Sequence, residues 1–449
     1  MTSTPPTSNS NGQVNPAGGI FGGLAQPVFR LFSGRVAREG YLAAIDQGII
    51  SLSNFLAAII LARQISPTEF GVYGVGFLLL HLVRAIQEGI SVQPLSALGA
   101  VMDLPGFRRY FSGAWLLQLA LAAISAGVAA FGGWLLTYLG NDTAGPALFM
   151  LWFPILVWQP QEFVRRAFYT RGMLFLAVLN TALASFIRIG LLVFLSSRGL
   201  LSGKAGIDAI GWGALCALIL GLWQARGYWT RHWTPLQAIW QQNWGFGRWL
   251  LGGTLANWVA MELYPILAAG VISFAAAGAF RALQNLVAPV HVLLRAIDTF
   301  LTPRAAVLYH EGGYRSLSRT LRLTYLLVGI PVIGTLLVAV AFPEFLLHLL
   351  YGDIYLEYSQ GIWLMALFYL LWYAYWPLQI AFKAIQLTRP IFVANLAAIA
   401  CMFTVGIWLI TRWGLYGTIA GQALNALIVC IVLWGAWGGF RRSLQTTQA

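Results

Sequence analysis

The chain has 449 residues, of which 59% are hydrophobic and only 9% are charged. A soluble domain carries about 25% charged residues, so this composition excludes a water-soluble monomer. The formal net charge of +13 is spread over short segments between apolar runs, which argues against a basic domain and a nucleic-acid partner. The apolar runs are about 20 residues long, as helices that cross a bilayer require, and lack the short alternating pattern of a β-barrel.

Residues 1–40 precede the first apolar run. The first 29 are rich in Pro, Ser, Asn and Gly and contain no Lys or Arg. They therefore lack the charged region of a signal peptide and predict a disordered tail. The segment that follows carries Arg30, Arg35 and Arg38 among apolar residues, a pattern typical of a segment lying on the membrane surface.

Twelve candidate spans follow, and they predict an all-α integral membrane protein. An N-terminal lobe at residues 41–225 contains Tyr41–Ala62, Gly71–Leu98, Phe111–Leu136, Ala147–Pro160 (continuing towards Phe168), Leu174–Leu195 and Ala205–Gln224. A cytoplasmic linker is predicted at residues 226–245. A C-terminal lobe at residues 246–440 contains Phe246–Ile272, Ala275–Leu301, Leu321–Ala341, Gln360–Phe382, Ile391–Ile410 and Leu415–Trp437.

The distribution of positive charge orients these spans. If both termini are cytoplasmic, the inside segments hold 18 of the 27 Lys and Arg residues. The outside segments then hold only Arg63, Arg198, Lys204 and Arg412. Because cytoplasmic loops of membrane proteins are enriched in Lys and Arg, this asymmetry predicts twelve spans with both termini inside.

The two halves show signs of an internal repeat at an offset near 210 residues. Ala214–Ile219 resembles Ala423–Ile428, and Gly71 corresponds to Gly278. A repeat with an even number of spans predicts two pseudo-symmetric six-helix lobes, related by an axis along the membrane normal.

Polar residues recur at helical spacing within the second and eighth spans. The second span contains His81, Arg84, Gln87, Glu88 and Ser91, and the eighth contains Arg281, Gln284, Asn285, His291, Arg295 and Asp298. A charged side chain at mid-bilayer costs about 2.5–3.5 kcal/mol, so such residues face protein or water. The stripes predict a hydrated cavity between the lobes, lined by Arg84, Arg281, Arg188, Gln284, Asn285 and Asn257, with Glu88 and Glu262 as further charged candidates.

A purely structural role for these charges stays open. Arg84 and Glu88 are four residues apart and can pair on one helix face. Arg281 has no acidic neighbour at helical spacing, so it requires an anion or an acid from another helix. HExxH, Walker and GxSxG motifs are absent, and the three cysteines lie within apolar runs. We therefore expect no catalytic residues, no metal and no cofactor.

Four segments resemble bacterial polysaccharide flippases, members of the superfamily that includes multidrug and toxic-compound exporters. They are Leu61–Tyr73, Gln161–Tyr169, Leu350–Tyr358 and Gly414–Gly417. Part of the first has a local reason, because Ser66 is placed to cap the second span, with Pro67 at its first position and Glu69 completing a capping box.

The resemblance implies a carrier of the inner (cytoplasmic) membrane that moves a lipid-linked oligosaccharide by alternating access, without covalent chemistry. It implies that Arg84, Arg281 and Arg188 contact the pyrophosphate or acidic sugars of a polyprenyl-linked substrate. Glu88 or Glu262 would couple transport to a cation. Expected partners are this substrate, membrane lipids and a polysaccharide polymerase. The alternatives are a drug or cation antiporter of the same superfamily, and a membrane-embedded polysaccharide polymerase or ligase.

Overall fold

The computed structural model describes residues 35–448, with side chains placed except at 35–39, 249, 295–296, 299–300, 302–304 and 443–448. Over this range the chain is helical and contains no strand. The predicted tail lies outside the described residues, as do the side chains of the predicted surface segment. We refer to residues 35–228 as the first bundle and to residues 236–448 as the second bundle.

Both bundles consist of long helices joined by short turns. The first bundle contains α2 (Arg35–Gln64), α3 (Pro67–Gln87), η1 (Glu88–Val92), α4 (Gln93–Val101), α5 (Leu104–Tyr138), α6 (Ala144–Phe149), α7 (Trp152–Thr170), α8 (Leu174–Ser197), α9 (Gly203–Gln224) and η2 (Ala225–Tyr228). The second contains α10 (Leu236–Val271), α11 (Phe274–Leu286), α12 (Ala288–Ala341), α13 (Pro343–Tyr351), η3 (Gly352–Tyr358), α14 (Gly361–Ala384), α15 (Arg389–Cys401), η4 (Met402–Gly406) and α16 (Ile407–Gln448).

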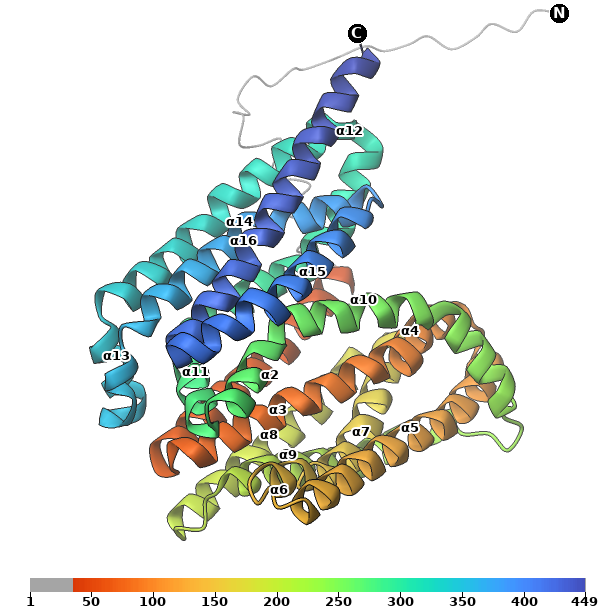
Figure 1. Cartoon of the computed structure of the whole chain (residues 1–449). Helices are drawn as coiled ribbons and strands as arrows, with labels where there is room; N and C mark the ends of the chain where they lie inside the picture. The colour runs from red at the N-terminus through yellow and green to blue at the C-terminus, as the bar shows by residue number, and fades with distance from the viewer. Residues whose placement is uncertain (1–34, 449) are drawn as a thin grey trace, which may run out of the picture.

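The bundles meet at one end of the molecule and diverge towards the other. Figure 1 shows α12 to α16 rising away from α3 to α9, with α10 running between the two groups. The junction is formed chiefly by α3 and α11. A single buried apolar cluster continues across it, from Phe70 and Tyr73 of α3 to Phe280 of α11 and Tyr355 of η3.

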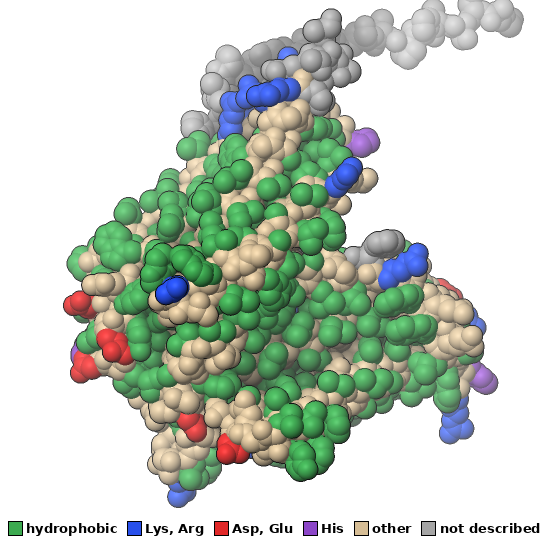
Figure 2. All heavy atoms as spheres, in the orientation of Figure 1, with side chains coloured by type: hydrophobic (Ala, Val, Ile, Leu, Met, Phe, Trp, Pro, Cys, Tyr) green, Lys and Arg blue, Asp and Glu red, His purple; other side chains and the backbone are tan. Residues whose placement is uncertain are grey.

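The chain is a multi-pass membrane protein. Eight helical stretches among the described residues are long and apolar enough to cross a membrane, and hydrophobic side chains cover most of the face in Figure 2. One of the eight, Arg389–Arg442, covers the last two predicted spans, which turn at Gly414 with a φ of +55°. The eight leave out α7, which carries Glu162, Arg165 and Arg166, and they also leave out the seventh and eighth predicted spans, which lie in α10 and in the stretch from α11 into α12. Twelve spans and cytoplasmic termini therefore stay predictions.

The start of α3 shows only part of the predicted capping box. The Ser66 hydroxyl accepts a hydrogen bond from the Glu69 backbone N–H at 3.2 Å, and Pro67 takes the first position of the helix. The predicted capping box is wrong in its second half. The Glu69 carboxylate instead accepts a hydrogen bond from the backbone N–H of Gly203, at the start of α9, so it joins two helices.

The two glycines that the repeat pairs, Gly71 and Gly278, lie against each other at the junction. A Cβ atom on Gly71 would lie 1.6 Å from the Phe274 carbonyl oxygen, and one on Gly278 would lie 2.4 Å from the Pro67 oxygen. Only glycine permits this approach of two backbones, a device that membrane helices use widely.

We predict that Gly71→Ala lowers the melting temperature of the detergent-purified protein, because the added methyl group forces α3 and α11 apart. Overpacking of this kind costs about 1–3 kcal/mol. Gly252→Ala is the matched control, since a Cβ there meets nothing within 4 Å and α10 gains helix propensity. Equal melting temperatures for the two variants would show that the close approach is not needed.

Candidate functional site

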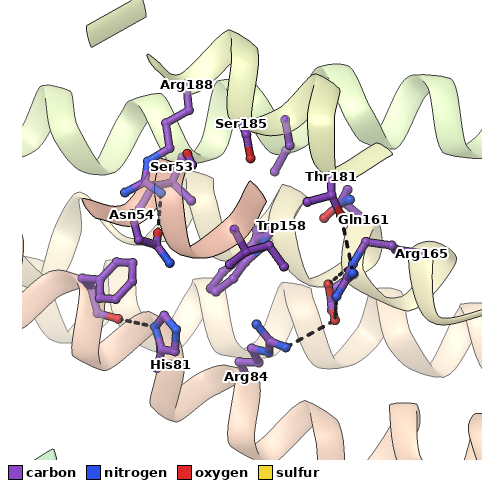
Figure 3. Close-up of a pocket in the computed structure, with 16 residues that line it drawn as sticks. Ser53, Asn54, His81, Arg84, Trp158, Gln161, Arg165, Thr181, Ser185 and Arg188 are labelled. Atoms are coloured by element: carbon purple, nitrogen blue, oxygen red, sulfur yellow. Dashed lines mark hydrogen bonds and ion pairs between the residues drawn. The ribbon is translucent and has the colours of Figure 1, made fainter. Parts of the chain in front are cut away.

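A hollow of about 100 Å³ lies inside the first bundle. Its walls come from α2, α3, α7, α8 and α9. Figure 3 shows the polar side chains and the tryptophan that converge on it: Ser53, Asn54, His81, Arg84, Trp158, Gln161, Arg165, Thr181, Ser185 and Arg188. The sequence predicts a cavity between lobes, yet of the predicted residues only Arg84 and Arg188 line this hollow.

Glu162 of α7 is the centre of a charge network on one wall. Its side chain is 4% exposed and accepts hydrogen bonds from Arg165 at 2.7 Å, from Arg166 at 2.9 Å and from Arg84 at 3.4 Å. Three guanidiniums around one carboxylate require further negative charge, because unpaired charge is costly away from water.

Two more carboxylates complete this network. Arg84 pairs with Glu88 at 3.3 Å, as the spacing in the sequence allows. Arg165 pairs with Asp46 of α2, which also accepts a hydrogen bond from the Tyr169 hydroxyl at 2.6 Å. The network therefore contains three arginines and three carboxylates, so it is neutral overall.

Sequence reasoning missed most of this network. It extended the fourth span past Pro160 towards Phe168, and α7 indeed runs to Thr170. It did not predict that Arg165 is buried or that it pairs with Asp46. The spacing of Glu162, Arg165 and Arg166 by three and four residues was the available signal.

Arg188 of α8 lies on the opposite wall of the hollow and differs from Arg84. Only 7% of the residue is exposed. Its guanidinium donates hydrogen bonds to Asn54 at 2.7 Å and to the Tyr73 hydroxyl at 2.8 Å. Among the described side chains no carboxylate pairs with it, and its Nε atom is buried without a hydrogen-bond partner. The nearby Ser53 hydroxyl is also buried and unpartnered.

Arg281 of α11 is the second such arginine. Its guanidinium stacks over the Phe77 ring at 5.1 Å and donates to Gln284 at 3.0 Å. Phe77 also lines the hollow. No carboxylate among the described side chains pairs with Arg281, and its Nε atom lacks a hydrogen-bond partner.

Further hydrogen-bond donors surround Arg281. The Asn285 amide nitrogen and the Tyr351 hydroxyl are buried without a partner of good geometry. Burial raises the pKa of Tyr351 to about 12, against the opposing effects of Asn285 and Arg281, so this hydroxyl stays a neutral donor.

The other predicted site residues lie elsewhere. Asn257 is exposed on α10, and Glu262 is half-buried on the same helix. Neither lines the hollow. The side chain of Arg295, a member of the predicted stripe, lies outside the described side chains. Among the described residues no three His, Cys, Asp or Glu side chains are grouped to hold a metal ion.

This fold is that of the MATE transporters of the MOP superfamily. An inward-facing multidrug resistance MATE transporter is similar over 89% of this chain and 96% of its own, with a TM-score of 0.68 and 17% identity. An outward-facing multidrug resistance MATE transporter is similar over 93% of this chain and 98% of its own, with a TM-score of 0.61 and 16% identity. A third similar structure is a MOP transporter from Pyrococcus furiosus, described as having a binding pocket of reverse polarity. It is similar over 91% of this chain and 95% of its own, with a TM-score of 0.60 and 15% identity.

The sequence gives the narrower assignment. The family described as polysaccharide biosynthesis protein matches residues 60–360, and the chain belongs to it. No curated protein matches the chain. The resemblance is confirmed at the level of the family and of the fold: the chain belongs to a polysaccharide biosynthesis family and has the fold of MATE transporters.

We predict that Glu162→Gln destabilises the protein by about 3–5 kcal/mol, because it leaves buried guanidiniums without their shared carboxylate. Glu88→Gln is the matched control. The Glu88 side chain is 28% exposed, so its loss costs less than about 1 kcal/mol. Thermal unfolding in detergent measures both, and an equal effect of the two substitutions contradicts a central role for Glu162.

Proposed function

We propose that this protein moves an oligosaccharide precursor, carried on polyprenyl pyrophosphate, across the cytoplasmic membrane by alternating access. The observation that carries the proposal is a pair of arginines, Arg188 and Arg281, without carboxylate partners among the described side chains. Arg188 is buried and Arg281 is half-buried. A guanidinium removed from water without a counter-ion costs free energy, up to several kcal/mol where it is fully buried. An anionic ligand group offsets that cost while it is bound, and guanidinium is the side-chain group best matched to phosphate oxygens.

The lining of the hollow supports a saccharide as the other part of the ligand. Hydroxyl and amide groups of Ser53, Asn54 and Gln161 face it together with the Trp158 ring. Sugars need such a mixture of polar partners and an aromatic surface. The polyprenyl tail requires no polar site, because it stays in the lipid.

The balanced network divides the predicted residues into two roles. Arg84 is neutralised by Glu88 and Glu162, so we assign it to shaping the wall of the hollow rather than to holding phosphate. Glu88 is likewise paired within the network, and either Glu88 or Glu262 is proposed to couple transport to a cation. Gln284 and Asn285 support Arg281, and Asn257 is proposed to contact substrate only after the bundles move.

The membrane topology that we propose is the one predicted from the sequence. Twelve spans form two six-helix lobes, at residues 41–225 and 246–440, joined by a linker at 226–245. Both termini lie in the cytoplasm, and the lobes rock about the junction. The exported precursor would pass to a polysaccharide polymerase. No covalent step belongs to the protein itself.

We predict that Arg281→Gln and Arg188→Gln each weaken binding of polyprenyl pyrophosphate to the purified protein by about 10- to 100-fold, the loss of one charge-assisted contact. Cells relying on either variant should lose surface polysaccharide while the protein still inserts into the membrane. Arg281→Lys keeps the charge and should retain part of the binding.

Arg412→Gln is the matched control, because this exposed arginine lies far along the chain from both. Unchanged binding in Arg188→Gln and Arg281→Gln would refute the anion site. A drug or cation antiporter would instead bind lipophilic cations, and this binding would depend on Glu262 and not on the two arginines.

A further inference from the structure

Two of the segments that carry the family resemblance contact each other across the bundle junction. Residues 61–73 belong to the first bundle, and residues 350–358 belong to the second. The Arg63 side chain donates hydrogen bonds from Nε to the Leu350 carbonyl oxygen, at 2.7 Å, and from Nη2 to the Leu349 carbonyl oxygen. The rings of Phe70 and Tyr355 lie 6.2 Å apart.

The target of Arg63 is the end of a helix. Leu349 and Leu350 belong to the last turn of α13, which ends at Tyr351. The last carbonyl groups of a helix have no partner within it and carry partial negative charge. A guanidinium therefore caps α13 from outside, and this cap is supplied by the other bundle.

We propose that these segments form a latch, defined as Arg63, Phe70, Leu349, Leu350 and Tyr355, which holds the bundles together at this end of the molecule. The Arg63 side chain is exposed, so water competes for its hydrogen bonds and the contact is of modest strength. A contact of modest strength suits an element that must break and re-form in each cycle.

The backbone contacts beside the latch tighten the same end. Gly71 and Gly278 touch, and the next helix turn places a Gly74 Cβ 3.8 Å from the Arg281 Cβ. Towards the other end the bundles diverge, as Figure 1 shows, although α10 stays packed on η1 through Gly247 and Gly89. The described conformation is therefore closed at the latch, and opening at this end requires that the Arg63 hydrogen bonds to α13 be broken.

Disulfide formation across the junction tests the latch without substrate. Cys216, Cys401 and Cys430 are first replaced by alanine, and Gly74→Cys and Arg281→Cys are added. Their Cβ separation of 3.8 Å is that of a disulfide, typically about 3.8 Å. The rate of disulfide formation in nanodiscs then reports closure of this end. It is measured with a maleimide mass tag, which labels only thiols that have not formed the disulfide.

We expect Arg63→Gln to slow disulfide formation about fivefold, as loss of an exposed charge-assisted cap implies. Arg63→Lys should slow it less, and Arg412→Gln should leave it unchanged. Equal rates for Arg63→Gln and its parent would overturn the latch, as would failure of the parent pair to form a disulfide. Because Arg281 is absent from every variant compared, the result is independent of whether that residue binds an anion.

Discussion

The cost of removing charge from water is the constraint on which this structure depends. Each guanidinium inside the first bundle must pair with a carboxylate of the protein or with an anionic ligand. Glu162 meets this need for three arginines at once, and Asp46 and Glu88 balance the remainder. The network thereby fixes α2, α3, η1 and α7 relative to one another.

Arg188 and Arg281 do not belong to this network, and they indicate which ligand the protein binds. Arg188 and Arg281 are held by neutral partners, Asn54, Tyr73 and Gln284, which orient a guanidinium without cancelling its charge. Both adjoin the Phe77 ring or the hollow that it lines. A fixed positive charge beside hydroxyl and amide groups is the arrangement that an anionic saccharide carrier needs, whereas a site for cations requires free carboxylates.

Contacts across the bundle junction depend on close packing of the helix backbones rather than on charge balance. In lipid there is no hydrophobic drive to join helices, so close backbone approach must supply the attraction. Gly71 and Gly278 permit that approach, and Arg63 adds a polar contact that water can displace. Such a junction is specific in geometry and modest in strength, which allows two bundles to separate without unfolding either.

The membrane class, the positions of most helices and the cap at Ser66 could be predicted from the sequence, because composition, run length and capping are local properties. The pairing of Arg84 with Glu88 was also accessible, since it depends on spacing within one helix. The pairing of Asp46 with Arg165 was not, because 119 residues separate them and only the packing of α2 on its neighbours brings them together. The Glu69 bond to Gly203 escaped prediction for the same reason.

We propose that the protein recognises the negative charge of its substrate rather than the lipid tail. Calorimetry in nanodiscs, comparing polyprenyl pyrophosphate with the uncharged polyprenol of the same chain length, tests it most directly. We expect the pyrophosphate to bind far more tightly, and we expect this preference to disappear when Arg188 and Arg281 are both replaced by glutamine. Equal affinity for the two lipids in the unaltered protein would contradict it.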